Sequence, residues 1–203
     1  MSSLPYILPV ELRQPPYPQD NRVGSNSILT FIATEGTLFA MLFASYWYLG
    51  KGKPQWPMGD PPKLHYAIPM LILLLASSAV LHFGEKKVRE HKVGAGMIFL
   101  GITILMGLGF IAMSVLDYQE RLQTLSPTQN AYGSIYYTTV TLHAAHLVLG
   151  LMMLLYVLLL PSIEPREVTP HWPYHNAALY WHFVDAVWVF VVFIMFIIPN
   201  IGR

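Results

Sequence analysis

Five long apolar stretches constrain the fold of this chain more than any other feature. They cover residues 28–49, 66–83, 93–116, 134–160 and 177–198 of 203. A helix that crosses a bilayer needs about 17–25 predominantly apolar residues, and each stretch has that length. Since every backbone polar group must be satisfied inside lipid, each stretch predicts an α-helix. We therefore expect an all-α, polytopic membrane bundle of five transmembrane helices.

The composition agrees with a membrane protein and excludes several other classes. The chain is 54% hydrophobic and only 11% charged, far from the balance of an average soluble domain. Its basic residues are scattered, whereas a nucleic-acid-binding protein gathers them on one face, so no nucleic-acid partner is expected. The absence of cysteine excludes disulfides, thiolate metal sites and iron–sulfur clusters. Any redox centre in this chain would need histidine or methionine ligands.

Residues 1–26 differ from the rest of the chain. They are rich in proline and polar side chains, and they lack the apolar core of a secretory signal peptide. We expect an extended, Pro-rich N-terminal tail here, which either wraps a neighbouring protein or stays mobile. Residues 27–203 then form one transmembrane domain that contains all five spans.

The positions of lysine and arginine favour one orientation in the membrane. The tail and the connections 85–92 and 161–176 carry seven of these residues, whereas the connections 50–65 and 117–133 and the C-terminus carry five. The small excess favours a cytoplasmic N-terminus and a C-terminus on the opposite side.

Asp185 and His182 lie one helical turn apart inside the last apolar span. An aspartate at the centre of a membrane helix costs roughly 2.5–3.5 kcal/mol on insertion scales, so it needs a partner inside the bundle. Residues three apart share a helix face, which makes His182 the nearest candidate. We expect Asp185 to pair with His182 or with a histidine of the fourth span.

His143 and His146 share one face of the fourth span because they are three residues apart. Such a pair suits a metal, or two haems with partners such as His82 and His182 on other helices. No acidic ligand falls three or four residues from the pair, however. Buried polar groups are usually satisfied by neighbouring protein groups, so we favour hydrogen-bonded structural histidines and expect no metal site.

Three acidic residues lie in or near other spans. Glu35 is inside the first span, at a depth similar to that of Asp185 if both spans start from the same side. It has two alternative roles, a structural hydrogen bond to a neighbouring helix or proton and lipid-headgroup chemistry. Asp117 and Glu120 follow the third span directly, and we expect them in an interface loop.

The third span carries several small residues. They include Gly94, Gly96, Gly101, Gly107 and Gly109. Small side chains let helix backbones approach closely in membranes, so we expect these glycines to serve helix packing.

The run Tyr180-Trp181-His182-Phe183-Val184-Asp185-Ala186-Val187-Trp188 resembles the signature of subunit III of haem-copper terminal oxidases. Other matches follow in the family's order from about residue 26 to residue 197. They are Thr34-Glu35, Leu116-Asp117-Tyr118, Tyr132-Gly133-Ser134 and His143-x-x-His146. Four positions depart from the family pattern: Thr34 replaces serine, Asp117 replaces glutamate, and Ala144 and Ala145 replace the residues between the two histidines. Five spans rather than seven resemble the shorter bacterial form, specifically of cytochrome c oxidase.

This resemblance implies a supporting subunit without a catalytic residue of its own. Haem and copper would belong to the partner subunits, and this chain would pack beside subunit I in a complex that also contains subunit II. The helices would form a V with phospholipids in its cleft, in the cytoplasmic membrane of a bacterium. The family role would be to keep proton uptake fast and to protect the oxidase from inactivation during turnover. A larger respiratory supercomplex is a further implied partner.

The resemblance also assigns roles to particular residues. Glu35 would be the intramembrane acid that faces the lipid cleft and the side of proton entry. The buried polar residues that hold the helices together would be His143, His146, Trp181, His182 and Asp185.

Several alternative functions stay open at this point. Subunit III of a quinol oxidase is the nearest, followed by a related subunit of a nitric oxide reductase, because other subunits choose the electron donor and the oxidant. A haem-binding membrane cytochrome would use the histidines, and a proton-coupled transporter would use Glu35 and Asp185. The transporter is disfavoured, since five spans do not divide into two inverted halves.

Overall fold

The computed structural model describes residues 21–58, 62–163 and 171–201. The helices are α1 (Asn21–Gly50), α2 (Leu64–Arg89), α3 (Val93–Leu122), α4 (Ala131–Ile163) and α5 (His171–Val191). A π-helical turn, η2 (Val192–Ile197), and the short α6 (Ile198–Ile201) continue α5. No strand occurs in these ranges. The fold is all-α, as predicted, and five of its helical segments are long and apolar enough to cross a membrane.

Each of the first four predicted spans lies inside one observed helix, whereas the fifth covers part of α5, all of η2 and the start of α6. Most helices extend further than the predicted spans. Helix α1 already begins at Asn21, so residues 21–26 of the predicted tail are helical, while residues 1–20 lie outside the described residues. Helix α2 continues from the apolar span to Arg89. Hydropathy marks only the length that lipid surrounds, whereas glutamate, lysine and arginine are good helix formers that continue a helix into the interface.

Asp117 and Glu120 show this effect and correct one prediction. We expected them in a loop after the third span, but α3 continues to Leu122, so both are helical. Their backbone groups stay in the helical hydrogen-bond ladder while their side chains reach the polar end of the bundle.

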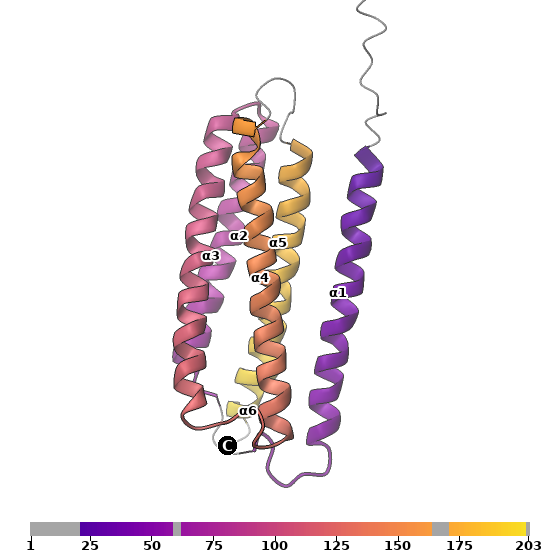
Figure 1. Cartoon of the computed structure of the whole chain (residues 1–203), viewed down its shortest axis with the longest axis vertical. Helices are drawn as coiled ribbons and strands as arrows, with labels where there is room; N and C mark the ends of the chain where they lie inside the picture. Colours follow the sequence, from indigo (N-terminus) through magenta and orange to yellow (C-terminus); the bar gives the residue numbers. More distant parts are fainter. Residues whose placement is uncertain (1–20, 59–61, 164–170, 202–203) are drawn as a thin grey trace, which may run out of the picture.

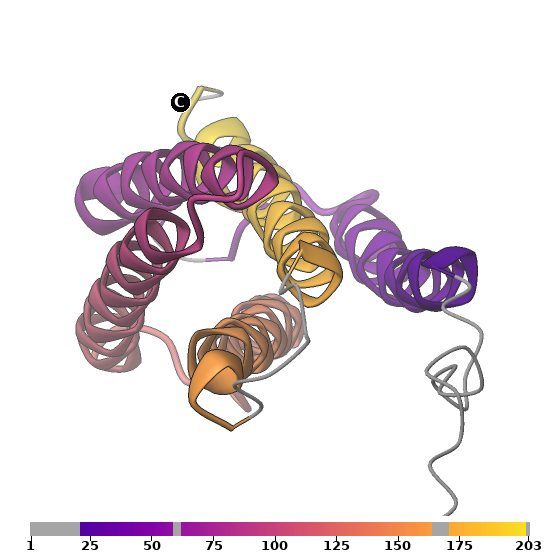
Figure 2. The ribbon, with the colours of Figure 1, turned by 90° about the horizontal axis from the view of Figure 1, so that it is seen from above.

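Helices α2, α3, α4 and α5 surround a common core, and α1 lies outside them beside α4 and α5 (Figures 1 and 2). The starts of α1, α3 and α5 lie at one end of the molecule, and the C-terminus lies at the other (Figure 1). Only 6% of the residues in the most apolar stretch of α1 are buried, against 56% for the last span. Helix α1 therefore turns most of its surface away from the bundle.

Trp181 of α5 contacts several helices at the centre of the bundle. Its side chain is fully buried, and its indole Nε1 donates a hydrogen bond to Ser77 Oγ of α2 at 3.0 Å. The ring occupies space that two glycines leave free. An added Cβ at Gly107 of α3 or Gly150 of α4 would lie only 2.7 Å or 3.1 Å from it. One tryptophan of α5 thus contacts three other helices.

Candidate functional site

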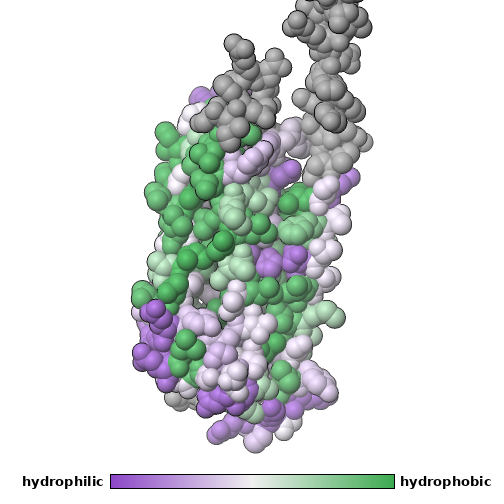
Figure 3. Space-filling view, viewed as in Figure 1, coloured by the Kyte–Doolittle hydropathy of each residue, from purple (hydrophilic) through white to green (hydrophobic). Residues whose placement is uncertain are grey.

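Glu35 of α1 and His146 of α4 form a hydrogen-bonded pair between the outer helix and the bundle. Glu35 Oε2 and His146 Nε2 are 2.8 Å apart. The side chain of His146 is 9% exposed and that of Glu35 is 21% exposed, so the pair is shielded by the bundle on the side of His146 and more open on the side of Glu35. Figure 3 shows a small hydrophilic patch at mid-height between α4 and α1, where most of the neighbouring surface is apolar.

The second nitrogen of His146 determines where the hydrogens lie. Nδ1 is 2.7 Å from the carbonyl oxygen of Leu142, and a carbonyl can only accept, so Nδ1 carries a hydrogen. The contact between Nε2 and Glu35 then contains one further proton. Either a carboxylic acid donates to a neutral imidazole, or an imidazolium donates to a carboxylate. The pair is electrically neutral in both states.

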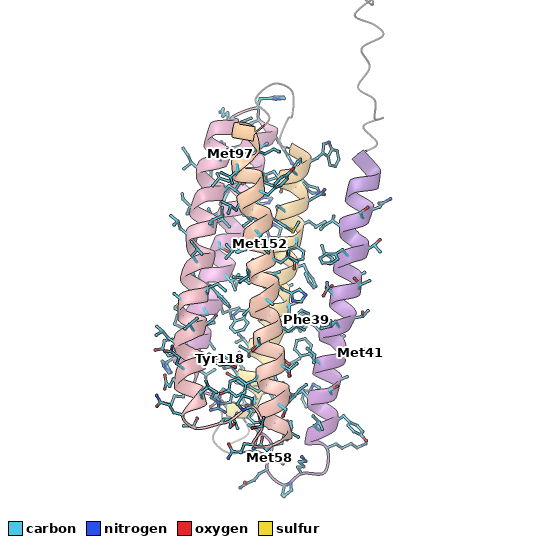
Figure 4. All side chains as sticks on the ribbon, viewed as in Figure 1. Phe39, Met41, Met58, Met97, Tyr118 and Met152 are labelled. Carbon is cyan, nitrogen blue, oxygen red and sulfur yellow. The ribbon has the colours of Figure 1, made fainter. Side chains whose placement is uncertain are left out.

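Phe39 covers this pair from the side of α1. It points from α1 toward the bundle (Figure 4), and its ring meets the ring of His146 edge-on at a centroid distance of 5.1 Å. The ring of His143, one turn before His146, is 6.4 Å from Phe39 and stacks on Trp188 at 4.9 Å. His143 is 1% exposed, and neither ring nitrogen has a hydrogen-bond partner among the described residues. Aromatic rings, rather than polar groups, enclose this histidine.

The last helix presents two further polar side chains to the bundle. His182 Nδ1 forms a short hydrogen bond with Ser78 Oγ of α2, in place of the bond to Asp185 that we expected. Asp185 is 4% exposed, and neither carboxylate oxygen has a hydrogen-bond partner in the part of the chain that the structure describes. Adjacent serines on α2 therefore hold both Trp181 and His182. Sequence spacing within α5 could not reveal this, because the partners come from another helix.

Asp117 and Glu120 line a pocket at the end of the bundle that contains the C-terminus. The lining also includes Lys63 and His65 from the start of α2, and Arg121 and Tyr136. Glu120 accepts from Lys63 Nζ at 2.6 Å, and its other oxygen is 3.1 Å from His65 Nε2. The hydrogen bond to Glu120 raises the pKa of Lys63 above its ordinary value. These contacts connect the start of α2 to the end of α3.

A polar cluster at the opposite end was not predicted from the sequence. Glu85 of α2 is 8% exposed, and its Oε1 accepts from Arg89 Nη2 at 2.6 Å and contacts His175 Nδ1 of α5 at 2.8 Å. The spacing of Glu85 and Arg89, four residues apart, is the one signal in the sequence for part of this cluster. Nothing in the sequence points to His175.

The described residues contain no group of three or more histidine, cysteine, aspartate or glutamate side chains that could hold a metal ion. His146, which we considered as a ligand, uses one nitrogen for Leu142 and the other for Glu35. Both ring nitrogens of His146 are thus engaged in hydrogen bonds within this chain.

Five long apolar helices with polar pairs between them define an integral membrane protein. A family model described as cytochrome c oxidase subunit III matches residues 22–199. The chain belongs to this family, and membership places it among the subunits of a multi-subunit, membrane-bound oxidoreductase.

Curated relatives agree with this family. The chain is 30% identical over 189 residues to cytochrome c oxidase subunit 3 of Bacillus subtilis, covering 88% of this chain and 89% of that protein. It is 33% identical over 172 residues to cytochrome c oxidase subunit 3 of Synechocystis sp., covering 83% and 72%. Cytochrome bo(3) ubiquinol oxidase subunit 3 of Pseudomonas aeruginosa is 28% identical over 184 residues, covering 86% of each chain.

Proposed function

We propose that this chain is the non-catalytic subunit III of a respiratory cytochrome c oxidase. It packs beside subunit I in a complex with subunit II, and these partners carry the haem and copper while this chain binds neither. The family match and the two relatives named as cytochrome c oxidase subunit 3 support this function. The helices would form a V, with phospholipids in its cleft.

The Glu35–His146 pair is the observation that carries the proton-related part of the proposal. A carboxyl group on the outermost helix holds a shared proton without bringing net charge into the bilayer. The shared proton can therefore move between Glu35 and His146 while the pair stays neutral. In the proposed function it supports rapid proton uptake by the oxidase and protects the complex from inactivation during turnover.

The surface of α1 supports a lipid cleft next to this pair. A hollow lined by Asn26, Ser27, Thr30, Phe31 and Thr34 opens on α1 before Glu35. The hydroxyl groups of Thr30 and Thr34 bond to carbonyls of their own helix, at Asn26 and Phe31, and are thereby compatible with an apolar surrounding. Phospholipid in this hollow would lie within two helical turns of Glu35.

We further propose that the protein lies in the cytoplasmic membrane of a bacterium with its N-terminus inside. In this orientation the start of α1 and the turn between α2 and α3 face the cytoplasm, and the pocket of Asp117 and Glu120 faces the other side. The excess of basic residues at the first end supports this orientation.

The composition of the native complex tests the supporting role. The tagged chain is purified from its own membrane in mild detergent, and absorption spectra are recorded before and after the partner subunits are stripped away. We expect haem and copper subunits in the intact preparation and no chromophore on the stripped chain. Haem that stays with the stripped chain would identify a cytochrome instead, and a colourless chain that purifies alone would favour a transporter.

The role of the pair is tested by Glu35→Ala in the intact oxidase. We expect the complex to assemble, with altered turnover or a shorter active lifetime at high pH. His146→Gln should give a similar effect, and the double variant should add little, because both changes remove the same unit. Glu120→Gln, which removes an acid at the far end of the bundle, is the matched control. Wild-type turnover and lifetime of Glu35→Ala across pH would reject the proposal.

Subunit III of a quinol oxidase is the second candidate. The relative from Pseudomonas aeruginosa, named as a ubiquinol oxidase subunit, is the observation that favours it. Oxygen consumption by the purified complex with reduced cytochrome c or with a quinol distinguishes the two directly.

A further inference from the structure

Basic side chains gather in the turn between α2 and α3, which we call the basic turn (residues 86–92). It contains four of the chain's 12 lysines and arginines, namely Lys86, Lys87, Arg89 and Lys92, and a single acidic residue, Glu90. No other segment of this length carries as many basic residues. The basic turn lies directly after the apolar part of α2, and thus where that helix leaves the hydrocarbon layer.

Backbone hydrogen bonds fix the conformation of the basic turn. Lys92 N–H donates to the Lys87 carbonyl at 2.9 Å, and His91 N–H donates to the Val88 carbonyl at 3.0 Å. His91 has a φ of 59°, the left-handed conformation in which many helices end. Val88 is buried against Gly96 of α3, which holds the two helices together below the turn. The backbone that carries the lysines is therefore held in place by hydrogen bonds and by this packing.

Internal ion pairs leave a positive excess in the basic turn. Arg89 is engaged by Glu85 at 2.6 Å. The carboxylate of Glu90 is shared between Lys87 Nζ at 3.1 Å and Lys92 Nζ at 3.8 Å, so one charge serves two lysines. Lys86 is exposed and makes no ion pair with any described residue. At least two positive charges thus remain without a full counter-charge from this chain.

Helix capping does not explain all of these charges. Lys86, Lys87 and Arg89 lie in the last turn of α2, where the helix dipole favours cations. Lys92, in contrast, directly precedes α3, and the dipole at a helix start disfavours a cation. The basic turn therefore holds positive charge even where the backbone opposes it.

An exposed aromatic side chain lies next to the charges on the membrane side. Phe83 is 56% exposed and is three residues before Lys86, so the two side chains share a face of α2. The face changes from aromatic to cationic within one helical turn. This sequence of groups matches a phospholipid, with the upper part of the acyl chains against Phe83 and the headgroup against Lys86.

We propose that the basic turn binds the headgroup of an anionic phospholipid. The ammonium groups of Lys86 and Lys92 would contact the phosphate, which supplies the missing negative charge. A basic residue near an anionic membrane surface contributes binding worth about fivefold in affinity. This site is separate from the proposed lipid cleft beside Glu35 and does not depend on it.

Photocrosslinking in the intact oxidase tests the site. The complex is reconstituted into nanodiscs of phosphatidylcholine that contain a small fraction of photoreactive phosphatidylglycerol, and the labelled peptides are identified by mass spectrometry. A photoreactive phosphatidylcholine serves as the neutral probe. The test variant is Lys86→Gln/Lys92→Gln, which leaves the Lys87–Glu90 pair in place. The matched control is Lys51→Gln/Lys53→Gln, which removes one exposed and one half-buried lysine from the other end of the molecule.

We expect the phosphatidylglycerol probe to label residues 83–92 more strongly than the neutral probe. The test variant should lose this labelling by about 25-fold, from about fivefold for each of the two lysines, and the control should keep it. Equal labelling by both probes, or an equal loss in the control, would overturn the proposal. If millimolar glycerol phosphate competes with the probe and abolishes the labelling, the basic turn is a site for a soluble phosphate instead. Release of another subunit from the test variant, with no change in labelling, would indicate a protein contact instead.

Discussion

Replacing Gly84 with alanine should separate three helices, because this glycine of α2 packs directly against α3 and α5. An added Cβ would lie 2.1 Å from the hydroxyl of Tyr174 on α5 and 2.8 Å from Cβ of Phe99 on α3. It would also lie 3.3 Å from the carbonyl oxygen of Gly96. The tyrosine hydroxyl is the end of a side chain and could move. Phe99 Cβ is fixed to the backbone, so α3 itself would have to shift.

The structure allows an estimate of the cost. Overfilling a packed site typically costs about 1–3 kcal/mol, and contacts this short belong at the upper end of that range. Displacing Tyr174 also weakens two long hydrogen bonds, to the carbonyls of Leu81 at 3.4 Å and Gly96 at 3.5 Å. The better helix propensity of alanine offsets about 1 kcal/mol. The free energy of unfolding should therefore fall by about 1–3 kcal/mol.

Gly101→Ala is the matched control, since nothing lies within 4 Å of a Cβ added at Gly101 of α3. It should leave stability unchanged or raise it by up to about 1 kcal/mol. Both variants are unfolded by increasing SDS in mixed micelles, and far-ultraviolet circular dichroism records the loss of helix. If Gly84→Ala matches the wild type, or if Gly101→Ala is destabilised as strongly, the close approach at Gly84 does not hold these helices together.

Three further substitutions test contacts at other levels of the bundle. Glu85→Gln removes the buried negative charge that Arg89 and His175 share and should cost about 2 kcal/mol in the same unfolding assay, whereas Glu90→Gln, at an exposed acid, should cost clearly less. Equal losses would contradict this difference in burial. Trp181→Phe deletes the hydrogen bond to Ser77 and leaves a void, for an expected loss of about 2 kcal/mol, and Trp47→Phe at a half-exposed position should change little. Because Glu120 raises the pKa of Lys63, that lysine contributes stability below its unfolded pKa and loses the contribution as pH rises through its folded pKa. The small loss in Lys63→Gln should therefore be constant from pH 6 to 9 and disappear only above about pH 10. A loss that already fades near pH 7 would refute the assignment.

The glycines of α3 show what the sequence can and cannot predict. Their clustering correctly indicated close packing at Gly96 and Gly107, where an added Cβ would collide with Val88 or with Trp181. At Gly94 and Gly101 the same signal was misleading, because nothing lies within 4 Å of an added Cβ. A sequence reveals which residues share a helix face, but the direction that face takes in the bundle depends on all the other helices.

The polar residues also show what the sequence can and cannot predict. Apolar length identified all five spans. The cost of burying an acid singled out Glu35 and Asp185, and the spacing of two histidines singled out His146. Their partners could not be predicted, since Glu35 meets a histidine 111 positions away, and Ser78, which hydrogen-bonds His182 across 104 positions, carries no distinguishing pattern. Depth in the membrane is readable from a sequence, whereas the neighbour at that depth is a property of the tertiary structure.

The contact of α1 with α4 and α5 has a consequence for biosynthesis. The ribosome delivers α1 first, while α4, which contains His146, follows about 100 residues later, after roughly 5–20 s at synthesis rates of about 5–20 residues per second. During this interval Glu35 lies in the membrane without its histidine, and an acid without a partner is costly there. Arrival of α4 then converts a lone acid into a hydrogen-bonded pair. The order of translation thus makes the docking of α1 a late event. If a chaperone or insertase delays α4, α1 should be the segment that proteases cleave first.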